Sequence, residues 1–397
     1  MSKPEPTTHK IECDYCGDAY LNHKASYIES LIAVTIDKHT TKLVSRVPKF
    51  VKRFVDYIPK ALFTLLTFFR IAKYSDDIEK TASFRSRIIW EEANRRGIKM
   101  EQILIFGKAS DHYRARFPDG RVIYFESIPI LPEFLDMKNN WDDKLILKQE
   151  FSKVGVPVPA YFRLPFYNLQ SLENIFKKFK TPVIVKPQVG SRARHTTTNI
   201  STLPHFKEAV RIASQISPYL VVEEYLLGDV CRATLVNGKL AGFYRGTAPH
   251  IVGDGVKTIR ELIDDKDNSR HERIQKVNRS QELHDHIGRF GFVIDDVLPK
   301  DLKISLSHRV GRLFGGSTRE MVDELHPSFI PHLEKAANTV GLAVAGFDCI
   351  VPEPTKDASE QRWGIIECNT LPFIDLHYYA LEGKPRNIAG MIWDMWD

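Results

Sequence analysis

Apolar residues recur along the chain with two periods, and each period predicts a different kind of element. Residues 27–75 favour helices, because apolar side chains from Phe50 to Phe69 lie three or four positions apart. The stretch Ser83–Arg96 repeats this spacing and ends at Gly97, a residue typical of helix C-termini. From Trp141 onward, strand and helix patterns interleave, which predicts a mixed α/β body.

Strands are predicted where short apolar runs meet turn residues. Residues 112–117 and 121–126 flank a Pro-Asp-Gly turn, and residues 235–240 contain an Asn-Gly turn, so both stretches favour β-hairpins. Buried apolar runs predict further strands at 102–106, 181–186, 220–222, 344–350 and 364–369.

Length and charge narrow the class of protein. The 397 residues suffice for two or three domains, and a hydrophobic content of 43% excludes a disordered or fibrous chain. The net charge is +6, but residues 38–73 alone hold nine Lys or Arg and one acidic residue. The rest of the chain is therefore slightly acidic, and we expect no nucleic-acid partner. The basic segment is either an amphipathic helix on an anionic membrane surface or partner, or a hairpin packed on the body with its basic face in solvent.

The five cysteines leave an odd one, which argues against a disulfide framework and for a reducing compartment. The N-terminus lacks the pattern of a secretory signal, and no apolar stretch reaches the ~18 residues of a spanning helix, so we expect a cytoplasmic protein. Cys13 and Cys16 form a CxxC pair with His9 and His23 outside it. This pattern fits either a zinc site or two thiols in a polar tail.

Two stretches carry residues suited to a nucleotide. Lys186 ends an apolar strand and precedes a cationic loop, an arrangement that could hold phosphate groups. Glu223 and Glu224 stand where the run 220–222 leaves the core, and backbone groups at such a position can meet an adenine edge. Both features also occur as a solvated charge or as an ordinary strand end.

Acidic side chains inside apolar strands predict a metal site. Asp348 lies within one such run, and Glu367 and Asn369 lie within another. Residues two apart on a strand face the same side, so Glu367 and Asn369 point together. Carboxylate and amide oxygens suit Mg²⁺, whereas the alternative is a pair of strand acids bonded to arginines.

The order of these motifs resembles that of the ATP-grasp ligases, in particular the branch of cyanophycin synthetase and the fused glutathione-forming enzymes. The most specific match is the block VGDGVKTIRELI at residues 252–263. The resemblance covers residues 141–397 and implies an ATP-grasp fold, α+β or α/β in class, with a small lid at about 150–228 and a larger C-terminal sheet. A small α/β pre-grasp unit at 81–140 and a basic helical N-terminal segment at 1–80 would precede it.

Matched position by position, the resemblance implies a set of site residues. Those on the nucleotide are Lys144, Lys186, Gly190, Arg194, Glu223, Glu224, Leu226 and Asp229, the last standing in for a ribose-binding acid expected at Val230. Those on the metal are Asp348, Glu367 and Asn369, and those facing the reacting carboxylate or acyl phosphate are Arg232, Arg245 and Arg309.

The chain departs from the family pattern mainly on the acceptor side. Ala193 and His195 replace glycines of the phosphate-covering loop, and only the glycines remain of an Asn-x-Ser-Thr-Gly-Gly stretch at 311–316. Asp375 stands where the family has an arginine near the acceptor, which suggests a cationic amine substrate, while His377 is kept.

The resemblance implies an enzyme that uses ATP and Mg²⁺, with Mn²⁺ as a substitute. It would join the carboxylate of an amino acid or peptide to an amine through an acyl phosphate, and it could form homo-oligomers. Two alternatives stay open: an ATP-binding module of the same fold without ligase activity, and phosphoryl transfer without ligation.

Overall fold

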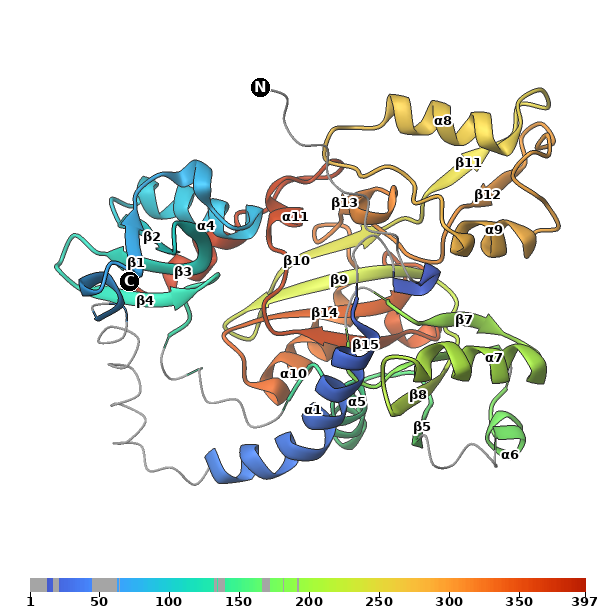
Figure 1. Cartoon of the computed structure of the whole chain (residues 1–397), viewed down its shortest axis with the longest axis horizontal. Helices are drawn as coiled ribbons and strands as arrows, with labels where there is room; N and C mark the ends of the chain where they lie inside the picture. The colour runs from blue at the N-terminus through green and yellow to red at the C-terminus, as the bar shows by residue number, and fades with distance from the viewer. Residues whose placement is uncertain are drawn as a thin grey trace.

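The computed structural model describes residues 13–16, 21–44, 63, 65–131, 134, 140–165, 172–180, 182–190 and 193–397. Its named strands form four sheets, and every strand pairing within them is antiparallel (Figure 1). Residues 45–62 and 64 of the basic segment at 38–73 lie outside the described residues, so its membrane or packing role stays a prediction. Among the helices that the structure describes, none is both long and apolar enough to cross a membrane.

The first sheet has the order β1-β2-β3-β4 and is covered by helix α4 (Phe84–Arg95), which Ser83 caps with its side chain. The predicted helix and the β3–β4 hairpin are confirmed. Residues 72–75 were predicted to be helical, but all four pair with residues 102–105 of β2. Hydrogen bonding to an exposed strand here outweighs a weak local preference. The strands are β1 (Ala72–Ser75), β2 (Lys99–Ile105), β3 (Lys108–Arg116) and β4 (Val122–Glu126).

The second sheet, with the order β5-β8-β6-β7, packs its own core against helices α6 (Leu172–Phe176) and α7 (Leu203–Ser214). We call this sheet with its two helices the β5–β8 unit. Helix α5 (Lys144–Lys153) precedes it in the chain. The strands are β5 (Tyr161–Pro165), β6 (Val183–Pro187), β7 (Thr197–Ile200) and β8 (Tyr219–Glu224).

The central sheet has the order β13-β10-β9-β14-β15 and holds the largest core. The predicted hairpin joins β9 to β10 through Asn237 and Gly238, whose φ values of 48° and 74° suit the type I′ turn that an Asn-Gly pair favours. Helix α10 (Ile330–Val340) packs on it. The strands are β9 (Asp229–Val236), β10 (Lys239–Gly246), β13 (Thr318–Glu320), β14 (Val344–Val351) and β15 (Gly364–Asn369).

A smaller unit between β10 and β13 holds the 252–263 block. Strands β11 (His250–Val252) and β12 (Lys303–Ser305) pair there, and helices α8 (Ile259–Ser269) and α9 (Gln281–Gly288) enclose a core with them. Thr258 and Glu261 cap α8 reciprocally, so part of this block has a local role as a helix start.

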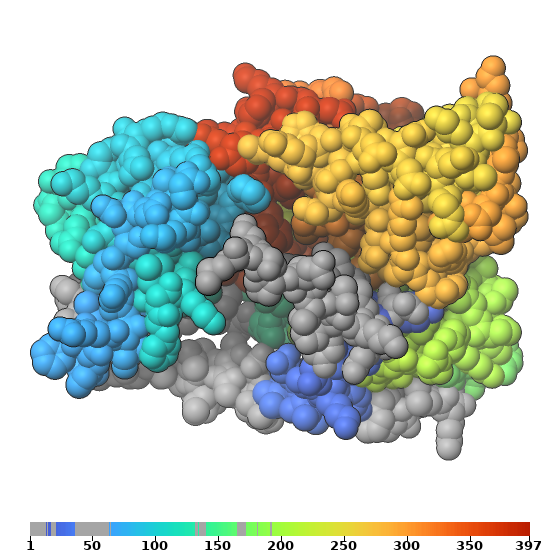
Figure 2. Space-filling view, turned by 45° about the horizontal axis from the view of Figure 1, so that its top comes forward, coloured from blue at the N-terminus to red at the C-terminus, as the bar shows by residue number. Residues whose placement is uncertain are grey.

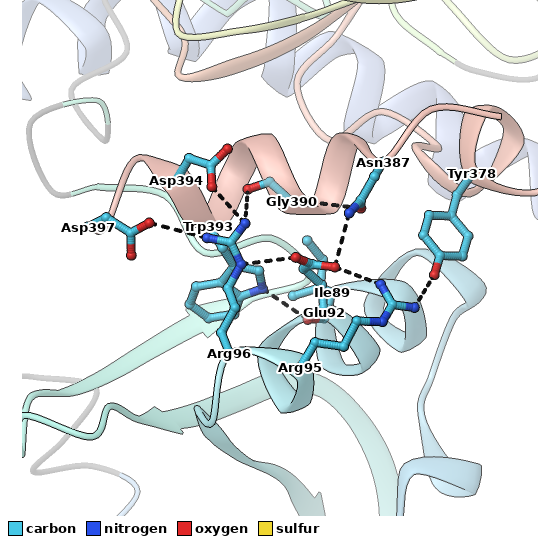
Figure 3. A network of polar contacts seen from close by, with 10 residues as sticks. All are labelled: Ile89, Glu92, Arg95, Arg96, Tyr378, Asn387, Gly390, Trp393, Asp394 and Asp397. Atoms are coloured by element: carbon cyan, nitrogen blue, oxygen red, sulfur yellow. Dashed lines mark hydrogen bonds and ion pairs between the residues drawn. The ribbon is translucent and has the colours of Figure 1, made fainter. Parts of the chain in front are cut away.

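The C-terminal helix α12 (Ile388–Asp394) returns to the first sheet and packs on α4. Glu92 of α4 accepts hydrogen bonds from Arg95, Arg96 and Asn387, so it links the two helices (Figure 3). The first sheet is thereby fastened to the central one. The remaining helices are α1 (His23–Val44), α11 (Asp375–Tyr378) and the 3₁₀ turns Asp14–Cys16, Ile78–Lys80, Arg312–Phe314, Pro327–Phe329 and Ala358–Glu360.

Candidate active site

A row of polar side chains crosses the central sheet at one level. Tyr244 pairs with Arg232, Arg232 with Asp348, and Asp348 with Glu367 on four successive strands. Directly opposed residues of antiparallel strands project from the same face. Asn369, two residues beyond Glu367, joins this face, so the structure brings together the three residues predicted to hold a metal.

Arg232 and Asp348 form a two-point ion pair within the row. The Nε and Nη2 atoms of Arg232 donate to the two carboxylate oxygens at 2.6 and 2.7 Å, and the Asn369 amide donates to Asp348 at 3.2 Å. Burial favours the neutral form of Arg232, but the adjacent Asp348 outweighs it and raises the pKa of Arg232 above its ordinary value. The alternative interpretation, a strand acid bonded to an arginine, is thus realised at Asp348, although not at Glu367.

A bulge in β15 connects this row to a buried lysine. The register shift between Asp348 and Cys349 leaves Ile366 unpaired, and its carbonyl accepts a hydrogen bond from Lys148 Nζ at 3.0 Å. Lys148 and Lys144 lie one turn apart on α5 and therefore share a face. The bulge turns a backbone acceptor toward that face.

Glu223 on β8 forms ion pairs with two lysines, one on α5 and one on β6. Its carboxylate lies 2.8 Å from Lys148 Nζ and 2.9 Å from Lys186 Nζ, and its side chain is fully buried. Burial raises the pKa of Glu223, but the two ammonium groups outweigh this and hold the pKa below its ordinary value. Burial lowers the pKa of Lys148 to about 8 in spite of the attraction of Glu223. Lys186 is held at the strand end, as the sequence predicted, but by a carboxylate.

Lys144 joins the two halves of the site. Its Nζ donates to the Gly190 carbonyl at 2.6 Å and lies 3.9 Å from the Glu367 carboxylate. The side chain of Asp143 caps α5, and Gln188 donates to the same carboxyl group at 2.7 Å, so the start of α5 is fixed against the loop after β6. Lys144 thus lies next to both Gly190 and Glu367, whereas Lys186 is linked to them through Glu223 and Lys148, which donates to the Ile366 carbonyl.

The strand exit after β8 is held by side chains as well as backbone. Glu224 accepts a hydrogen bond from Ala160 N at 3.0 Å and pairs with Arg362 at 2.6 Å, and Leu226 is buried. Gly228 has a φ of 137°, and a Cβ there would lie 2.6 Å from the backbone of Val351. Only glycine allows the chain to pass this closely into β9.

Three predicted arginines have different surroundings. Arg245 forms an ion pair with Asp229, which also places the proposed ribose acid next to a cation. Arg309 pairs with Glu282 at 3.0 Å and stacks on Phe314, at a cavity of about 420 Å³ in the unit between β10 and β13. No acidic side chain of the described residues forms an ion pair with Arg194, so its charge stays available to a ligand.

Buried polar groups lie in the region where the sequence predicts the amine substrate to bind. His377 is fully buried between Glu320 and Thr234, at 2.5 and 2.8 Å, and a Cβ on Gly242 would collide with its ring. Burial raises the pKa of Asp375, whose Oδ1 has no hydrogen-bond partner among the described residues. His377 is therefore a structural link, whereas Asp375 keeps an unused acceptor.

The residues of the row fit a magnesium ion by their chemistry. Asp348, Glu367 and Asn369 offer hard oxygen ligands from adjacent strands, and Mg²⁺ prefers such ligands together with phosphate oxygens. Their side chains stay partly accessible, at 16% for Asp348 and 25% for Glu367, against 0% for Glu223. Asp348 and Glu367 are therefore accessible enough to bind a metal ion in place of the Arg232 and Lys144 side chains next to them.

Known proteins are similar in sequence to about 64% of this chain. Cyanophycin synthetase from Synechocystis is 32% identical over 265 residues, which are 64% of this chain and 30% of that protein. The glutathione biosynthesis bifunctional protein GshAB from Mannheimia succiniciproducens is 27% identical over 268 residues, 63% of this chain and 35% of that protein. The chain thus matches about a third of the length of these curated relatives. No model of a known protein family matches it.

A solved structure has a similar fold. The crystal structure of a bifunctional glutathione synthetase from Pasteurella multocida superposes with a TM-score of 0.54 at 21% identity, covering 80% of this chain and 43% of that one. These likenesses in sequence and fold support the resemblance to the ATP-grasp ligases. The fold class and the resemblance expected from the sequence are both confirmed.

Several residues of the candidate site were not predicted from the sequence. Lys148 was not selected, although a lysine four positions after Lys144 within an apolar helix face is an available signal. Glu282, the partner of Arg309, and Glu320, the partner of His377, gave no signal, because each lies more than twenty residues from its partner. Such pairings depend on the topology of the sheets.

Proposed function

We propose that the chain is an ATP- and Mg²⁺-dependent ligase that joins a carboxylate to an amine through an acyl phosphate. One observation carries the proposal: cations from helix α5 and oxygen donors from the central sheet meet at the 3.9 Å contact between Lys144 Nζ and the Glu367 carboxylate. A triphosphate and its metal need this combination of positive side chains and carboxylates in one place.

The side chains would act by charge and position. Lys144, Lys186 and Arg194 offset the negative charge of the phosphates, and Arg232 neutralises charge that develops on the γ-phosphoryl group. Asp348, Glu367 and Asn369 would hold Mg²⁺, which when bound supplies Lewis-acid stabilisation of the phosphate oxygens. The substrate carboxylate attacks the γ-phosphorus, the bond to the β-phosphate oxygen breaks, and ADP leaves. An amine then attacks the acyl carbon and releases phosphate. No side chain needs to act as nucleophile.

Residues 150–228 would form the lid of this enzyme. The β5–β8 unit has a core separate from that of the central sheet, which supports movement as one body. Closure of the unit over the nucleotide would keep water from the acyl phosphate. The backbone around Glu224 and Leu226 would meet the adenine, and Asp229 the ribose.

The proposed substrates are an amino acid or a short peptide. The printed names of the relatives, cyanophycin synthetase and glutathione biosynthesis protein, support this class. Arg245 and Arg309 are available to bind a substrate carboxylate, and Asp375 to bind a cationic group on the amine substrate.

The test is a screen for ADP release over pairs of amino acids and short peptides, with and without hydroxylamine. A ligase forms a hydroxamate with the correct acid, because hydroxylamine captures the acyl phosphate. A phosphorylated product that is stable to hydroxylamine would indicate phosphoryl transfer. ADP formation that never depends on an added acid would contradict the ligase proposal.

One observation favours a second candidate, an ATP-binding module without ligase activity. Both oxygens of Asp348 are already engaged by Arg232, as in a purely structural ion pair. Calorimetry separates the two candidates: the module binds Mg·ATP but yields neither ADP nor hydroxamate with any acid, whereas the ligase yields both.

A further inference from the structure

Four metal-binding side chains converge at the junction of the N-terminal segment and the β5–β8 unit. They are Cys13 and Cys16 at the 3₁₀ turn, His23 at the start of α1, and His195 from the stretch between β6 and β7. We call them the Cys–His cluster. Their ligand atoms all lie within 4.8 Å of one another, although 172 positions separate His23 from His195 in the sequence. Figures 1 and 2 show these N-terminal residues, in blue, beside the yellow-green β5–β8 unit.

The sulfur–nitrogen distances in the cluster are close to those of a tetrahedral zinc centre, with the shortest a few tenths of an ångström below them. Cys16 Sγ lies 3.0 Å from His23 Nε2 and 3.4 Å from His195 Nε2, and Cys13 Sγ lies 3.7 Å from His195 Nε2. Zinc bonds of ~2.3 Å to sulfur and ~2.0 Å to nitrogen place tetrahedral ligand atoms about 3.3–3.8 Å apart. The two rings stand nearly perpendicular, at 84°, which lets both direct a nitrogen to one point.

The surrounding groups orient the ligands as in a metal site. The Nδ1 atom of His195 lies 2.8 Å from the Ile212 carbonyl, so this nitrogen carries the proton and Nε2 faces the cluster with its lone pair. Histidines that bind metals usually donate their second nitrogen in this way. The His195 ring and Cys16 are buried, and the His195 backbone N–H donates to the Tyr15 carbonyl at 3.2 Å.

We infer that Cys13, Cys16, His23 and His195 bind one structural Zn²⁺ that fastens the N-terminal segment to the β5–β8 unit. Two cysteines and two histidines fill all four positions of a tetrahedral zinc ion, which leaves none open for catalysis. The cysteines are free thiols in the structure, as thiolate ligands require. Of the ligands considered from the sequence, His9 lies outside the described residues, and His195 takes the fourth position.

The position of His195 gives the zinc ion a consequence for the site, and this step rests on the proposed function. His195 follows Arg194, the cation available for phosphate, and both Ala193 and His195 have positive φ, at 51° and 50°. Non-glycine residues hold this backbone only where their surroundings fix it. The zinc ion would supply that fixation, which replaces the flexibility of the glycines expected at these positions.

The primary experiment measures metal in the full-length protein after expression in zinc-supplemented medium. We expect one Zn²⁺ per chain by elemental analysis. Replacement by Co²⁺ should give the d–d bands of a tetrahedral ion and a thiolate-to-cobalt charge-transfer band. Both signals should disappear in Cys16→Ser and His195→Asn. They should persist in the matched control His205→Asn, a partly exposed histidine of the same unit, and in His9→Asn.

Thiol titration tests the same inference without a variant, in case a substitution prevents folding. Three of the five cysteines, Cys231, Cys349 and Cys368, are buried in the central sheet, so only Cys13 and Cys16 can become reactive while that sheet stays folded. We expect no reactive thiol in the zinc-loaded protein and two after removal of the metal with a chelator. These readouts do not depend on ligase activity, so the inference and the proposed function can fail separately.

Either of two results would overturn the inference. One is a folded, zinc-supplemented protein that contains no stoichiometric zinc and whose two thiols react fully before chelation or are joined in a disulfide. The other is zinc that persists in Cys16→Ser and His195→Asn but is lost in His9→Asn, which would assign the ion to a different ligand set.

Discussion

Two carboxylates in the site are paired with cations, but they differ in access to solvent. Glu223 lies between Lys148 and Lys186 with no exposed surface, whereas Asp348 and its partner Arg232 keep 16% and 10% of their side-chain surface. Glu367 and Asn369 flank Asp348, whereas the ion pairs that Glu223 forms among the described residues are with two lysines. Charge pairing alone therefore does not identify a ligand site. Accessibility and additional oxygen donors separate a ligand-binding pair from one that holds two segments together.

The largest effect that this comparison predicts is on stability. Glu223→Gln leaves two buried ammonium groups without their carboxylate, and breaking a buried ion pair by removing one partner costs about 3–5 kcal/mol. Urea unfolding should therefore show a much lower midpoint. Glu224→Gln is the matched control on the same strand, because its pair with Arg362 is half exposed and is worth about 1 kcal/mol or less. Equal losses in the two variants would contradict the distinction.

Glu367→Ala should have the opposite profile, with lost activity and retained stability. Glu367 is a proposed metal ligand, and loss of one electrostatic group in an active site typically reduces the rate about 10²-fold. The measurement is ADP release at saturating Mg·ATP, together with the unfolding midpoint. The exposed Glu360→Ala serves as control and should match the parent protein in both. Parent-like ADP release by Glu367→Ala would remove the metal assignment.

The third prediction concerns how the stabilisation by Glu223 depends on pH. Its pKa is lowered in the folded protein, so its stabilising contribution is complete above the unfolded pKa of about 4.3 and is lost as the pH falls through the lower folded value. The difference in unfolding free energy between the parent and Glu223→Gln should therefore not decline as the pH falls from about 7 to 5. It should shrink only below about pH 4.3. A difference that already declines from pH 7 to 5 would indicate a raised pKa and contradict the pairing.

The sequence predicted the backbone of the site better than its charge pairs. Strands β14 and β15 followed from apolar runs, and the acids followed from their place inside those runs, because both signals are local. The β1 strand and the partners of Glu223, Arg309 and His377 did not follow, since they depend on which strands become neighbours. The Cys–His cluster is an intermediate case. Cys13, Cys16 and His23 form a visible motif, but His195 joins them only through folding.

Asp375 is a third carboxylate, in the region where the amine substrate is proposed to bind. It is largely enclosed, yet among the described residues its Oδ1 accepts no hydrogen bond, unlike the oxygens of Asp348. If this oxygen receives a cationic group of the amine substrate, Asp375→Asn should lower kcat/KM for a basic amine about tenfold, as loss of one charge-assisted hydrogen bond does. The neutral isostere of the same amine should lose little. ADP release with the two amines measures this ratio, and exposed Asp301→Asn is the control. An equal loss for both amines would mean that Asp375 positions neighbouring residues such as Arg312, and the acceptor would then need no positive charge.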